Sequence, residues 1–76
     1  MAIISEDVIE DLEDGLRMQY EYIEKIDSED IRLRYIAQLR DDTILIANVV
    51  HKHNLHYDMD EFFRRSGYTG IAPRYN

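Results

Sequence analysis

Three histidines lie close together in the C-terminal part of the sequence, and imidazole is a common metal ligand. They are His51, His53 and His56. If a helix continues to residue 56, His53 and His56 lie one turn apart on one face, with Asp60 one turn further. A zinc or iron site needs three or four converging ligands, and the remaining ones cannot be identified. We therefore expect polar residues at a helix end, where the helix dipole favours a charged imidazole, and no bound metal.

Catalytic groups are scarce in this sequence. It contains no cysteine, so disulfides and thiolate metal sites are excluded, and it has no glycine-rich phosphate loop. Ser5, Ser28 and Ser66 fit helix caps and turns better than nucleophiles. Acidic side chains on a polar helical face are normally just solvated. We expect a protein that is not an enzyme and that uses no cofactor.

The net charge limits the classes of partner. Sixteen acidic side chains against nine Lys and Arg give −7 over 76 residues, which argues against non-specific binding to nucleic acid or to an anionic membrane. Solubility explains this charge, and an acidic inhibitor that mimics nucleic acid is the alternative. No run of eighteen apolar residues could span a membrane, and residues 1–5 lack the features of a signal peptide. We expect a cytoplasmic protein.

The spacing of apolar residues predicts two long helices. The first helix is expected over residues 5–26, with Ser5 as its N-cap. Asp27 and Ser28 end that helix and cap the second, which is expected over residues 28–54. So short a connection makes the two helices antiparallel neighbours. One face of the first helix carries Ile9, Leu12, Leu16, Tyr20, Ile23 and Ile26 at steps of three and four.

The second predicted helix is apolar nearly all round over residues 44–50, which read ILIANVV. Tyr35 lies on its main stripe and, like Tyr20, is expected in the core. A helix with apolar residues on every face must be covered on more than one side, and one antiparallel neighbour cannot do this. We expect a third helix from the same chain and also a second copy of the hairpin, which completes a four-helix bundle. The predicted dimer interface consists of Leu39, Ile46 and Val50.

The third helix is predicted over residues 58–66. Asp58 and Glu61 form a capping box, and Gly67 stands where a C-terminal cap belongs. Residues 1–67 are thus a predicted helical domain and residues 68–76 an extended tail. Aromatic side chains are enriched where protein surfaces meet, although simple packing of the tail over the core explains them nearly as well. The predicted partner-binding residues are Tyr57, Phe62, Phe63, Tyr68, Ile71 and Tyr75.

The segment YIEKIDSEDIRLRYIAQLRDD resembles the helical hairpin of ferritin-like proteins, including the rubrerythrin-like and spore-coat ferritin-like families. The following LHYDMDEFFRRSGY looks like the end of spore-coat members, so the resemblance covers about residues 8–68. It implies a di-iron centre built from a glutamate of one helix and Glu-x-x-His of its neighbour.

The residues at the implied iron positions depart from that family pattern. The counterpart of Glu-x-x-His here is Asp42-Thr43-Ile44-Leu45, in which leucine stands where histidine should be. Glu10 or Glu13 could be the partner carboxylate, but Gly15 falls close to the expected ligand position. The resemblance therefore implies the scaffold without the iron.

The segment IANVVHKHNLHYDMDEFFRRSGY also has the general shape of a helix–turn–helix DNA-reading motif. Its recognition helix would open with Asp60 and Glu61, whose charge has the wrong sign for phosphates, and Arg64 and Arg65 come only at its far end. We predict a small non-catalytic protein–protein interaction or assembly module that acts as a helical homodimer. The alternatives are a ferritin-like metal-binding protein, a helix–turn–helix DNA-binding regulator and the acidic inhibitor.

Overall fold

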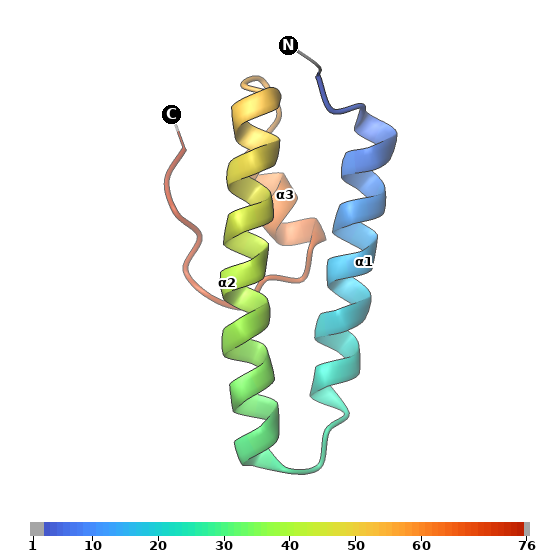
Figure 1. Ribbon diagram of the computed structural model, residues 1–76, viewed down its shortest axis with the longest axis vertical. Coiled ribbons are helices and arrows are strands. Elements are labelled where there is room, and N and C mark those ends of the chain that lie inside the picture. The colour runs from blue at the N-terminus through green and yellow to red at the C-terminus, as the bar shows by residue number, and fades with distance from the viewer. Residues whose placement is uncertain (1–2, 76) are drawn as a thin grey trace.

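The computed structural model describes residues 3–75, and over this range the chain forms three α-helices and no strand. α1 (Glu6–Glu24) and α2 (Glu29–His53) make an antiparallel hairpin. The short α3 (Met59–Arg65) packs against one side of that hairpin, behind it in Figure 1, and an extended tail then crosses α2. The predicted all-α class is confirmed. No helix in the described range is long and apolar enough to cross a membrane.

Each helix begins at a side chain that caps it. Ser5, Ser28 and Asp58 are the three N-caps, and each side-chain oxygen accepts a hydrogen bond from the backbone N–H three residues later, at 3.4, 3.4 and 3.2 Å. Such a bond satisfies one of the backbone donors that a helix start leaves free. The caps were predicted from the sequence because their residue types and spacing are local signals.

The end of α3 is a Schellman motif. Gly67 has a φ of +77°, which only glycine adopts readily. Its N–H donates to the Arg64 carbonyl, and the N–H of Tyr68 donates to the Phe63 carbonyl at 3.2 Å. The Phe63 and Tyr68 rings lie 5.0 Å apart, which is the apolar contact typical of this motif. The motif reverses the chain and directs the tail back over α2.

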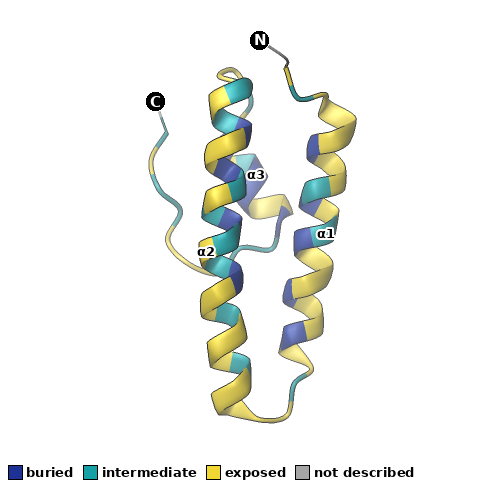
Figure 2. Cartoon of the chain, in the orientation of Figure 1, coloured by how far each residue is buried: buried dark blue, intermediate teal, exposed yellow. Residues whose placement is uncertain are grey.

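The core lies where α3 meets both long helices. Phe62 is at its centre and is fully buried. Towards the α1–α2 connection the hairpin has only two helices, and exposed residues predominate on α2 there (Figure 2). The buried apolar residues are Ile9, Leu16, Tyr20, Ile23, Leu39, Ala47, Val50, Met59, Phe62 and Phe63.

Two residues of the predicted dimer interface belong to this core. Leu39 is 4 % exposed and Val50 is fully buried within the single chain, so both mainly pack the chain's own core, and most of the surface that α2 can offer to a second copy comes from other residues. Ile46 is half-buried. Tyr35 was expected in the core but is 56 % exposed, because it lies on the part of α2 that has no third layer.

One buried hydrogen bond joins α1 to α2. The hydroxyls of Tyr20 and Thr43 lie 2.8 Å apart, and the Thr43 hydroxyl donates to the Leu39 carbonyl at 2.7 Å. Since a hydroxyl has one proton to donate, the Tyr20 hydroxyl is the donor to Thr43. Burial raises the pKa of Tyr20, which keeps this donor protonated.

Replacing only Thr43 leaves the Tyr20 hydroxyl buried without an acceptor. We expect Thr43→Val to lower the free energy of unfolding by about 1–3 kcal/mol, which is the cost of an unpaired buried polar group. The Tyr20→Phe/Thr43→Val double variant removes both partners and should be more stable than Thr43→Val alone. Urea unfolding of Thr43→Val, of Tyr20→Phe alone and of the double variant measures the three losses. A double variant that loses the sum of the two single losses would contradict the hydrogen bond's role.

Candidate interaction surface

The side of the hairpin that faces away from α3 is uncovered and largely apolar. On α1 it carries residues at steps of four and three, namely Val8, Leu12, Gly15, Gln19, Tyr22 and Ile26. On α2, helical periodicity places on the same side Ile31, Tyr35, Gln38, Asp42, Leu45, Ile46 and Val49. We call these thirteen residues the open face. This spacing is a second heptad-like stripe on each helix, separate from the one that packs the core.

Two shallow grooves run along the open face. The larger, about 580 Å³, is lined by Gly15, Met18, Gln19, Tyr22, Ile23, Ile26 and Tyr35. The smaller, about 270 Å³, is lined by Leu16, Gln19, Leu39, Asp42, Leu45 and Ile46. Gln19 lines both, so the two grooves meet there, and no residue of α3 or the tail lines either one.

Several large apolar side chains along the open face are well exposed. Tyr22 is 72 % exposed, Leu45 64 % and Val49 51 %, with Met18 at the rim and Tyr35 further along α2 similarly open. Single exposed apolar residues are ordinary on a protein surface, but a contiguous patch along two helices marks an interaction site. The apolar segment ILIANVV pointed to Leu45 and Val49, whereas Met18 and Tyr22 were not singled out from the sequence.

Polar groups interrupt the open face at its middle. Gln19 and Asp42 line the smaller groove from opposite helices. Gln38 donates a hydrogen bond to the Asp42 carboxylate at 3.1 Å, which holds that carboxylate at the rim of the groove. A polar residue inside an apolar helical stripe fixes which partner positions can align with it.

The predicted partner-binding residues lie on the opposite side of α2, where most of them pack the chain's own tail. Phe62 and Phe63 are buried, and Tyr57, Tyr68 and Tyr75 are half-buried. The Tyr75 ring lies 4.7 Å from His51 and 6.1 Å from Phe63. Of the six, only Ile71 is exposed, at 94 %.

Hydrogen bonds fix the tail to α2. The Arg40 guanidinium donates to the Thr69 hydroxyl at 2.9 Å, and the Tyr75 hydroxyl donates to the Asn48 side chain at 2.8 Å. These contacts agree with the packing of the tail over the core, which is one of the two explanations that the sequence left open.

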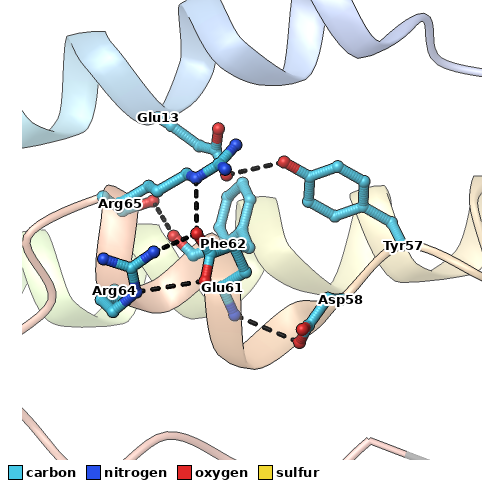
Figure 3. A network of polar contacts seen from close by, with 8 residues as sticks. Glu13, Tyr57, Asp58, Glu61, Phe62, Arg64 and Arg65 are labelled. Carbon is cyan, nitrogen blue, oxygen red and sulfur yellow. Dashed lines mark hydrogen bonds and ion pairs between the residues drawn. The ribbon is translucent and has the colours of Figure 1, made fainter.

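A buried carboxylate links α1 to the segment before α3. Glu13 is 1 % exposed, and the Tyr57 hydroxyl donates to its Oε2 at 2.9 Å (Figure 3). Arg65 lies beside both groups and donates to Glu61 at 2.8 Å, and Arg64 also pairs with Glu61. The sequence signal for Glu13 was its position, four residues after Ile9 and three before Leu16.

Burial has the largest effect on the pKa values of Glu13 and Tyr57 in this network. It raises the pKa of Glu13, against the opposing effects of the Tyr57 hydrogen bond and the Arg65 charge. Burial and the bond to Glu13 raise the pKa of Tyr57 to about 12, so the phenol remains a donor. The hydrogen bonds from Arg64 and Arg65 lower the pKa of Glu61. The arrangement ties α3 to α1.

The three histidines are not brought together as metal ligands. His51 and His53 are half-buried and His56 is exposed. Nδ1 of His51 is buried and makes no hydrogen bond, while its ring packs on Tyr75. Among residues 3–75 no group of three or more His, Cys, Asp or Glu side chains could hold a metal ion.

The comparisons with known proteins find no match: no family model, curated protein or solved structure matches this chain.

Glu13 should make the stability depend on pH. Its folded-state pKa lies above its usual value of 4.5, so the folded chain binds this proton more tightly than the unfolded chain. The free energy of unfolding therefore falls as the pH rises from about 4.5 through the folded pKa. We expect Glu13→Gln, which keeps an acceptor for Tyr57, to unfold at a higher temperature than the wild type at pH 7.

The advantage of Glu13→Gln should shrink as the pH is lowered towards 4.5, where the wild-type carboxyl is protonated. Thermal unfolding followed by circular dichroism across this range measures it. Glu21→Gln removes the same charge from an exposed position of α1 and is the matched control. An equal shift for both variants would show that net charge, not burial, is responsible.

Proposed function

We propose that this chain is a non-catalytic assembly module that pairs with a second copy of itself through the open face, so that two hairpins form a four-helix bundle. The observation that carries the proposal is the apolar stripe on each long helix that α3 and the tail leave uncovered. In water such a stripe is stable when it is buried against another apolar surface.

The size of the open face supports a stable pair. A standard interface buries about 800 Å² on each partner. Five large apolar side chains of the open face and one at its rim, each between about half and three-quarters exposed, supply most of that area from one chain. The five are Val8, Tyr22, Tyr35, Leu45 and Val49, and the residue at the rim is Met18.

The shape of the chain supports the same proposal. The molecule is a slab of 43 × 23 × 18 Å. α3 lies on one broad side and the tail runs along the outer edge of α2 (Figure 1), while the open face is the other broad side. A second hairpin laid on the open face would be the third and fourth helices of a bundle of ordinary geometry. In this proposal the ferritin-like hairpin serves as an assembly scaffold without iron chemistry.

A negative charge in the open face should prevent pairing. We expect Leu45→Glu to raise the dimer dissociation constant at least tenfold, or about 1.4 kcal/mol, because each interface would bury two unpaired carboxylates. Sedimentation velocity across a dilution series, with the molar mass measured on the same samples, gives the dissociation constant.

Leu33→Glu is the matched control. Leu33 is also an exposed leucine of α2, at 55 %, but it lines a different groove with Arg40 and Thr69 on the side of the tail. This variant should pair as the wild type does. A wild-type chain that is monomeric at tens of micromolar, or an equal loss in both variants, would refute the proposal.

A further inference from the structure

No feature of the single chain requires a glycine at position 15. It lies inside α1, where glycine lowers helix propensity relative to alanine, and its backbone is helical, with no positive φ that would require glycine. A Cβ added there meets nothing within 4 Å. Gly15 also lines the larger groove of the open face. The missing side chain therefore leaves space on the surface where a partner would approach.

Leu45 lies at nearly the same height on the neighbouring helix. The contacts of Ile4 with Asn54 and of Tyr20 with Thr43 fix how α1 and α2 are aligned. Counting along both helices from these contacts places Gly15 level with a residue of α2 between 43 and 48. Leu45 is in the middle of that range, is 64 % exposed and projects from the open face.

We propose that the Leu45 side chain of each copy fills the space above Gly15 of the other copy. The inference rests on the proposed self-association and specifies which residues of the two copies meet. A two-fold contact must present both halves of each interaction on one surface, and the open face does so, with a gap at Gly15 and a projecting leucine beside it. The two hairpins then lie with their α1–α2 connections at the same end, and α1 of each copy packs against α2 of the other.

This alignment also suits three other levels of the open face. We count along α1 and along α2 of the second copy, one turn at a time, from the pair Gly15–Leu45. Leu12 then lies level with Val49 of the second copy and Ile26 with Tyr35, so apolar residues meet apolar ones. The same count pairs Gln19 with Asp42, so the polar residues at the middle meet each other. A side-chain amide can donate to a carboxylate, which satisfies both groups when the interface closes.

The opposite alignment is disfavoured by charge. If the connections lay at opposite ends, α2 would pack along α2 of the second copy about its midpoint. α2 runs from residue 29 to residue 53, so that midpoint is residue 41, and the two Asp42 residues would lie only about 3 Å apart along the helix axis. Two like charges without a partner cation repel when an interface removes their water.

Gly15→Ala tests whether the space above Gly15 is used in pairing. It should stabilise the fold of the monomer but weaken the dimer. In a Leu45→Glu background, where the chain is monomeric, the substitution should stabilise the fold, with an approximately fivefold higher ratio of folded to unfolded chain, since alanine is the better helix former. In the otherwise wild-type chain it should raise the dimer dissociation constant. Gly15→Leu should raise it further, by tenfold or more.

Exchanging the large and the small side chain between positions 15 and 45 distinguishes the proposed contact from self-association by some other geometry. Gly15→Leu/Leu45→Ala moves the large side chain to the other helix and should pair more tightly than Gly15→Leu alone. If the wild type pairs and Leu45→Glu breaks the pair, but Gly15→Leu leaves the dissociation constant unchanged, the proposed function stands and this inference is overturned. A wild-type chain that stays monomeric overturns both.

The direction of the hairpins is measured independently. Because the chain has no cysteine, Asp27→Cys places one spin label at each α1–α2 connection. The proposed alignment predicts a label-to-label distance well below the 43 Å length of the molecule. A distance near that length would show opposite directions and overturn the inference.

Discussion

The structure depends on an imbalance between its helices. α3 has seven residues and α2 has twenty-five, or about 10 Å against about 37 Å of helix. So short an element can cover only one side of the hairpin over part of its length, and the chain uses it, with the tail, on the side that holds Phe62 and Phe63. The core is complete there, while the other side keeps an apolar stripe with no cover from the same chain.

The few buried polar groups lie where different segments of the chain meet. The Tyr20–Thr43 hydrogen bond lies in the core between α1 and α2, and the Glu13–Tyr57 bond lies where α1 meets the α2–α3 connection. Each joins segments that apolar contact alone would hold with less defined alignment. The alignment of α1 with α2 in turn sets Gly15 level with Leu45, so the polar contacts of the core define the pattern presented on the surface.

The elements themselves were predictable because their signals are local. Ser5, Ser28, Asp58 and Gly67 mark helix ends through bonds to residues only three to five positions away. The side on which each residue lies was harder to predict. Leu39 and Val50 fall on a stripe with Ile46, and which part of that stripe faces inwards depends on where α3 packs. Glu13 was missed as a buried residue because its partner is 44 positions away and a charge at a core position contradicts the apolar pattern.

The Schellman turn at Gly67 also determines at which end of the hairpin the tail finishes. It sends the chain back along α2, where Tyr75 reaches Asn48, and Ile4 is held by Asn54 at the same end of the hairpin. Figure 1 shows both described chain ends opposite the α1–α2 connection. A domain fused to either end would therefore lie at the end of the hairpin opposite the α1–α2 connection.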